Sequence, residues 1–99
     1  MAGSFVEPVA GSFVVVVLPT ALMRLFPGCE REISVSAGTV REMVEALEAR
    51  WPGMRDRICD STPRVRRHIN IFVEGERATL DAPLSPGAEV FIMTAISGG

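Results

Sequence analysis

The sequence has no lysine, so all ten of its basic residues are arginines. Without lysine side chains, the amino terminus is the one amine available for acylation, which disfavours self-linked chains joined through side-chain amines. The formal net charge of −2 argues against a nucleic-acid backbone as a partner. The cluster of Arg64, Arg66 and Arg67 also lacks interleaved aromatic residues. We therefore interpret it as a solvated loop or as a site that docks on an acidic partner.

Cysteine and histidine are also scarce, since the chain has two cysteines, Cys29 and Cys59, and one histidine, His68. The cysteines form no CxxC pair, and with a single histidine they make a poor metal site. We expect two free thiols, and the sequence leaves open whether they have any redox role. No candidate nucleophile has a base beside it in the sequence, so the chain is not expected to be an enzyme.

Long apolar segments are absent as well. The longest apolar run, residues 13–18, is far too short to span a bilayer. The first basic residue is Arg24, so the chain lacks the positively charged start of a signal peptide. These two absences predict a cytoplasmic protein.

The 99 residues are expected to form a single domain, because this length is typical of one hydrophobic core. Residues 1–11 lack periodicity and are predicted to be a flexible extension. Residues 12–94 form the predicted domain, and residues 95–99 form a flexible tail. The sequence leaves open the role of residues 1–11 and the oligomeric state.

Two strands are predicted near the start of the domain. Residues 12–18, "SFVVVVL", are β-branched and apolar on both faces, which is typical of a strand inside a sheet. After a long connection, "TALMRLFPGC", residues 30–36 alternate apolar and polar side chains, with Ile33 and Val35 on one face. We expect these two strands to form a hairpin.

One amphipathic helix is predicted over residues 39–51. Thr39 and Glu42 form a capping box, in which their side chains accept hydrogen bonds from free N–H groups at the helix start. A single apolar stripe is formed by Val40, Met43, Val44, Leu47 and Trp51. The opposite, solvent side carries Arg41, Glu42, Glu45 and Glu48. This stripe predicts a helix that covers one face of a sheet.

The remaining segments complete an α+β domain. A short helical turn is predicted at residues 55–59, strands at 68–73 and 90–94, and a short return strand after the Glu-Gly turn. The predicted architecture is a mixed four- to five-stranded sheet with one main helix on one face.

The second face of this sheet is predicted to be apolar in its middle. If Val90 and Ile92 point toward the helix, then Phe91 and Met93 point away from it, and Phe72 joins them from a neighbouring strand. A contiguous exposed apolar patch is typical of a docking surface, so these three residues are predicted to dock on a partner. Self-association, or coverage by residues 1–11, is the alternative.

The sequence ends in "AISGG", and glycine can pass through a channel that any Cβ atom would block. The five residues 95–99 can extend about 16–18 Å. A terminal carboxylate is ionised at neutral pH and is a poor electrophile, so it reacts only after activation, most simply as an acyl-adenylate made from ATP. This chemistry assigns catalysis to a partner and makes the chain a carrier.

The segments "VVLPTALMRLFPGCE", "RHINIFVEGE" and "GAEVFIMTAISGG" resemble the ubiquitin-like β-grasp sulfur carriers of the ThiS/MoaD class. The resemblance covers residues 13–99. Within the class these segments look most like the carrier that supplies sulfur for cysteine biosynthesis, followed by the small subunit of molybdopterin synthase.

This resemblance implies a specific role for the tail. A ubiquitin-activating-type adenylyltransferase would use ATP to adenylate Gly99, which is then converted to a thiocarboxylate. Gly98, Ser97, Ile96 and Ala95 would thread the active site of a partner. In the cysteine pathway, a pyridoxal-phosphate synthase would accept the sulfur and a zinc metallopeptidase would release the product. The carrier itself is expected to bind no cofactor and no metal.

Several other functions stay open from the sequence. Within the class they are the molybdopterin synthase small subunit, thiazole synthesis and transfer-RNA thiolation, because the same diglycine chemistry serves all of them. Outside it they are a protein modifier, whose terminus is joined to target amines, and a plain binding module.

Overall fold

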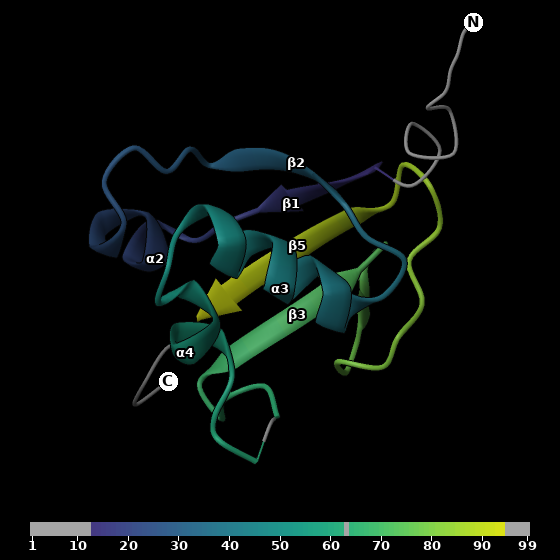
Figure 1. Cartoon of the computed structure of the whole chain (residues 1–99). Helices are drawn as coiled ribbons and strands as arrows, with labels where there is room; N and C mark the ends of the chain where they lie inside the picture. The colour runs from purple at the N-terminus through teal and green to yellow at the C-terminus, as the bar shows by residue number, and fades with distance from the viewer. Residues whose placement is uncertain (1–12, 63, 95–99) are drawn as a thin grey trace, which may run out of the picture.

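Five strands form one mixed sheet in the order β2-β1-β5-β3-β4 (Figure 1). The computed structural model describes residues 13–62 and 64–94. The strands are β1 (Phe13–Val17), β2 (Glu32–Ser36), β3 (Ile69–Val73), β4 (Glu76–Arg77) and β5 (Glu89–Thr94). The prediction of a mixed four- to five-stranded sheet is therefore confirmed, with five strands. The last strand in the sequence, β5, is the central strand of the sheet.

The pairing of β5 fixes the direction in which the chain leaves the sheet. β5 runs parallel to β1 and antiparallel to β3, whereas β1–β2 and β3–β4 are antiparallel. Because β1 and β5 are parallel, Phe13 at the start of β1 and Thr94 at the end of β5 lie at opposite ends of the sheet.

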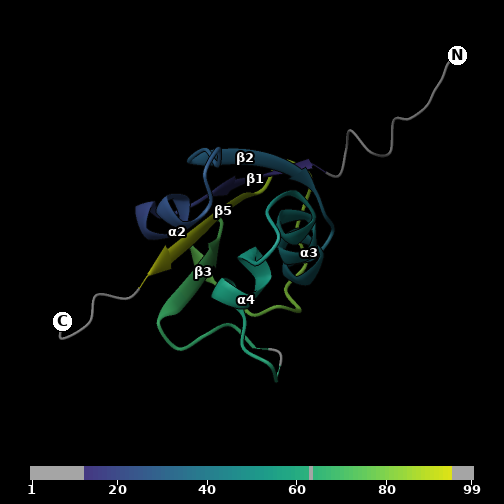
Figure 2. The same ribbon diagram turned by 60° about the vertical axis from the view of Figure 1, so that its left-hand side comes forward.

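The predicted main helix is α3 (Val40–Arg50), which lies across one face of the sheet (Figures 1 and 2). One hydrogen bond of the predicted capping box is present: the Glu42 N–H donates to Thr39 Oγ1 at 3.1 Å. The Glu42 carboxylate accepts from the N–H of Gly38, at 2.7 Å. Both bonds satisfy N–H groups that have no partner within the helix.

A second helix, α2 (Thr20–Leu25), lies in the long connection between β1 and β2, where the sequence analysis placed no helix. Pro19 precedes the helix with φ −77°, and alanine, leucine and methionine in the helix all have high helix propensity. A six-residue helix is too short to be stable alone. It is held by Leu22, which is buried in the core.

A third helix, α4 (Met54–Ile58), confirms the short helical turn predicted in this region. The Glu48 carboxylate caps it by accepting hydrogen bonds from the N–H groups of Gly53, at 3.1 Å, and Arg55, at 2.8 Å. Gly53 has φ 102°, which favours glycine. Glu48 was predicted to face water, and it is partly exposed. Its carboxylate also holds the start of α4.

The core fills the space between the sheet and α3. Residues no more than 1% exposed come from both layers: Val14, Val16, Val90 and Ile92 from the strands, and Met43 and Leu47 from α3. Burying each such side chain contributes about 1.5–3 kcal/mol. Within residues 13–62 and 64–94, no helix is long and apolar enough to cross a membrane.

The cap formed by Glu48 predicts a pH-dependent stability. Hydrogen bonds from Arg55 and Gly53 favour the carboxylate and lower the pKa of Glu48 in the folded protein. The stability from this shift is therefore present above the unfolded-state pKa, about 4.3, and is lost as the pH falls through the lower folded-state pKa. We expect Glu48→Gln to lower the free energy of unfolding at neutral pH, and the gap from the wild type to shrink in acid.

Urea denaturation over a series of pH values measures this gap. Glu76→Gln is the matched control, because Glu76 is exposed on β4. A Glu48→Gln gap that stayed constant from neutral to acidic pH would contradict the capping role of the carboxylate.

Candidate functional site

The face of the sheet opposite α3, here called the open face, carries the three residues predicted to dock on a partner. Phe91 is 38% exposed and Met93 is 49% exposed, and Phe72 is partly buried. Their neighbours Val90 and Ile92 point into the core. The predicted assignment of faces along β5 is therefore confirmed, whereas the docking role stays a prediction.

The strand registers bring Phe72 and Phe91 side by side. Phe91 pairs with Phe72 on one side and with Val17 on the other. Registered partners share a face of the sheet and have Cβ atoms about 4.5–5.5 Å apart in antiparallel pairs. Val17 therefore joins Phe72, Phe91 and Met93, and we call these four residues the open-face patch.

Charged residues of opposite sign flank the open-face patch on the two outer strands. Val17 pairs with Glu32 on β2, and Phe72 pairs with Arg77 on β4. One row across the sheet thus reads Glu32, Val17, Phe91, Phe72 and Arg77. An apolar centre with a charged rim is the usual anatomy of a protein interface. The sequence analysis missed Val17 and both rim residues, since only the register places them in this row.

The open-face patch lies close to the tail along the chain. Met93 is followed by Thr94, which ends β5 and pairs with Ile69 at the start of β3. The predicted tail residues Ala95, Ile96, Ser97, Gly98 and Gly99 lie outside the described residues. A protein that covered the open-face patch would also meet the chain where it leaves the central strand.

Two further exposed apolar side chains were not predicted. Leu25, on α2, is 48% exposed, and α2 lies beside the end of β5 in both views (Figures 1 and 2). Phe13 is 41% exposed, but it lies at the opposite end of the sheet from Thr94. Phe13 is therefore remote from the point where β5 ends.

Neither cysteine provides a reactive thiolate. Cys29 and Cys59 are both free, and Cys59 is buried. Burial raises the pKa of the Cys59 thiol, and the Asp60 carboxylate raises it further. Burial and Glu30 raise the pKa of Cys29 in the same way. Both thiols are therefore protonated at neutral pH and are weak nucleophiles. Among the described residues, no three His, Cys, Asp or Glu side chains gather closely enough to hold a metal ion.

Comparison with known proteins identifies the family. The sequence model of the ThiS family matches residues 16–99, which is most of the chain. The chain belongs to the ThiS family. This ThiS-family chain is 32% identical over 92 residues to the sulfur carrier protein CysO of Mycobacterium tuberculosis, an alignment that covers 87% of this chain and 98% of CysO.

Solved structures show the same fold. A chain in the crystal structure of the Amycolatopsis orientalis BexX/CysO complex matches with a TM-score of 0.77 and 29% identity, over 87% of this chain and 99% of that one. The crystal structure of SAMP1 from Haloferax volcanii matches with a TM-score of 0.74, over 88% of this chain and 99% of that one. At 24% identity, SAMP1 shows the fold alone. The ubiquitin-like β-grasp fold expected for this ThiS-family chain is therefore confirmed.

Proposed function

We propose that this ThiS-family protein is a sulfur carrier, in which the carboxylate of Gly99 is adenylated and then converted to a thiocarboxylate that donates sulfur. The observation that carries the proposal is the similarity to CysO, which is named a sulfur carrier protein and aligns over almost its whole length. The family match also runs through the two glycines to Gly99.

The chemistry requires two steps at the terminal carboxyl group of Gly99. A carboxylate oxygen of Gly99 attacks the α-phosphorus of ATP, which releases pyrophosphate and leaves an acyl-adenylate. Hydrosulfide then attacks the carbonyl carbon, displaces AMP and, after loss of a proton, leaves the thiocarboxylate. The raised pKa values of Cys29 and Cys59 make this chain's own thiols unsuited to the second step. A partner adenylyltransferase therefore supplies catalysis and ATP, and this chain acts as a carrier.

The open-face patch provides the surface on which we propose that partners dock. Phe91 sits on the central strand, only a few residues before the tail, so a bound enzyme covers Phe91, Phe72 and Met93 while it receives the chain beyond Thr94. The five residues 95–99 reach about 16–18 Å when extended, which is enough to enter an active site. The BexX/CysO complex shows that a structurally similar chain has been crystallised with a partner protein.

We propose that the sulfur serves cysteine biosynthesis, as the sequence resemblance of residues 13–99 implies. The partners that follow are a pyridoxal-phosphate cysteine synthase that accepts the sulfur and a zinc metallopeptidase that releases the product. The small subunit of molybdopterin synthase is the alternative within the class.

A protein modifier is the second candidate, because an activated terminal diglycine carboxylate can also be joined to target amines. A modifier would appear in cell lysates as a ladder of conjugates. A sulfur carrier would instead be recovered as the free protein.

The narrow-channel argument predicts a steric effect at the tail. We expect Gly98→Val to lower the rate of ATP–pyrophosphate exchange with the adenylyltransferase by about 100-fold, because a branched side chain displaces the reacting carboxylate from its position. Ser97→Ala, which removes an atom instead of adding bulk, is expected to retain exchange. Normal exchange by Gly98→Val would overturn the channel argument.

The docking role predicts a contrast between two exposed phenylalanines. We expect Phe91→Glu to weaken binding to the adenylyltransferase by about tenfold or more, because a buried interface side chain is replaced by a charge. Phe13→Glu is the matched control: Phe13 is similarly exposed but lies at the far end of the sheet. Titration calorimetry measures both affinities.

Neither substitution is expected to change the free energy of unfolding by more than about 1 kcal/mol, because both side chains are on the surface. Equal loss of affinity in the two variants would show that the open-face patch is not the docking surface.

A further inference from the structure

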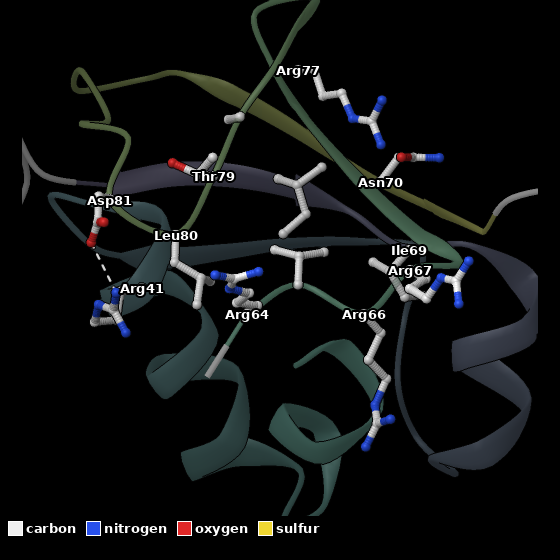
Figure 3. Close-up of a pocket in the computed structure, with 13 residues that line it drawn as sticks. Arg41, Arg64, Arg66, Arg67, Ile69, Asn70, Arg77, Thr79, Leu80 and Asp81 are labelled. Carbon is white, nitrogen blue, oxygen red and sulfur yellow. Dashed lines mark hydrogen bonds and ion pairs between the residues drawn. The ribbon is translucent and has the colours of Figure 1, made fainter. Parts of the chain in front are cut away.

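A groove of about 570 Å³ runs along the free edge of the sheet (Figure 3). The short strand β4 pairs with Phe72 and Val73. Beyond it, the Ile71 carbonyl accepts a hydrogen bond from the Ala78 N–H at 2.8 Å, and the Ile69 N–H donates to the Arg66 carbonyl at 2.9 Å. Residues 64–67 form one wall of the groove and residues 77–81 form the other. The groove therefore has the shape of a slot along a strand edge, and it is separate from the open-face patch except at its rim residue Arg77.

Positive charge is concentrated in this groove. Half of the chain's ten arginines line it: Arg41, Arg64, Arg66, Arg67 and Arg77. Its one acidic residue is Asp81, which accepts a hydrogen bond from Arg41 at 2.8 Å. Both side chains of this pair are well exposed, so the pair is weak and an incoming carboxylate can compete for Arg41. The net charge of the whole chain is nevertheless −2, which makes the groove a local exception.

Three of the five guanidinium groups have no partner among residues 13–62 and 64–94. The Nε of Arg66 donates to the carbonyl oxygen of Asp56 at 2.7 Å, and its side chain turns toward the helices (Figure 3). In the described part of the chain, Arg64, Arg67 and Arg77 make no side-chain hydrogen bond or ion pair. Each guanidinium can bind a carboxylate through two parallel hydrogen bonds, and such charge-assisted bonds are among the strongest in proteins.

Between the arginines, the groove is apolar. Val65 and Ala78 line it and are partly exposed, whereas Ile69, Ile71 and Leu80 are buried beneath them. Among the described residues that line it there is no aromatic side chain, so nucleobases would have nothing to stack on. Aliphatic side chains of a peptide, by contrast, fit such a surface, and this favours a protein segment over a nucleic acid.

We infer that this groove, the arginine groove, binds an extended acidic segment of a partner protein. The segment lies in the groove between residues 64–67 and residues 77–81. In an extended chain, alternate side chains point to opposite sides. One set of side chains therefore places carboxylates against the exposed Arg64 and Arg67, and the other set places aliphatic groups against Val65 and Ala78, which are partly exposed.

The position of the groove suits a partner that also handles the tail. Ile69, at one end of the groove, pairs directly with Thr94, where β5 ends. An acidic segment in the arginine groove is thus one strand away from the exit of the tail. The binding itself does not depend on sulfur chemistry at Gly99, so it can fail or succeed independently of the proposed function.

The test is a titration of the full-length protein, labelled with nitrogen-15, with a short peptide in which Asp and Val alternate and both ends are blocked. We expect chemical-shift changes centred on residues 64–67 and 77–79, and affinity that falls as salt is added. The double charge reversal Arg64→Glu with Arg67→Glu should weaken binding by about tenfold or more. Arg24→Glu is the matched control, because it makes the same charge change on α2, outside the groove.

Further measurements decide the outcome. The amide spectrum of each variant establishes that it is folded, and Arg77→Gln gives a milder substitution with the same expected direction. Tighter binding of a thymidine oligonucleotide than of the acidic peptide would overturn the inference in favour of nucleic acid. Equal binding of a peptide with Lys in place of Asp, or shift changes confined to the open-face patch, would also overturn it.

Discussion

The insertion of β5 between β1 and β3 is the constraint on which the other features depend. Val90 and Ile92 on one side of this strand are buried against the α3 layer, so the strand cannot shift without exposing the core. The same packing fixes Phe91 and Met93 on the open face. Because β5 is parallel to β1, it also carries the chain out at the end of the sheet opposite Phe13. Stability, the open-face patch and the direction of the tail thus have one physical cause.

This coupling limits how the site can change. A shift of one residue in the register of β5 would move Phe91 into the core and Val90 onto the surface. The energetic cost of burying or exposing these side chains therefore protects the geometry of the surface that we propose for docking. On the other side of β3, beside the short strand β4, lies the arginine groove. It is rich in arginines, whereas the open-face patch is apolar in its centre. The two surfaces lie close together, because Ile69 at one end of the arginine groove pairs with Thr94 at the end of β5. One partner can therefore contact both surfaces.

Local sequence patterns predicted the features that depend on neighbouring residues. The capping box located α3, and the alternation in residues 90–93 assigned the faces of β5. Helix α2 was missed because its stability comes from burial of Leu22 and not from a long periodic pattern. The roles of Val17 and Arg77 could not be predicted, because pairing between distant strands places them beside Phe91 and Phe72. Only part of the arginine groove could be recognised in the sequence. Residues 64–67 are a local cluster of arginines, whereas Arg41 and Arg77 are brought to it by the fold.

The central claim is that Gly99 carries sulfur, and chemical labelling of the terminus tests it most directly. The protein is incubated with ATP, its adenylyltransferase and a sulfur source, and is then alkylated with a thiocarboxylate-reactive reagent. Labelling is needed because replacing oxygen with sulfur changes the mass almost as much as oxidation of one of the five methionines. We predict a label on Gly99 that requires ATP. An unlabelled Gly99, with an enzyme shown to be active on another carrier, would contradict the account.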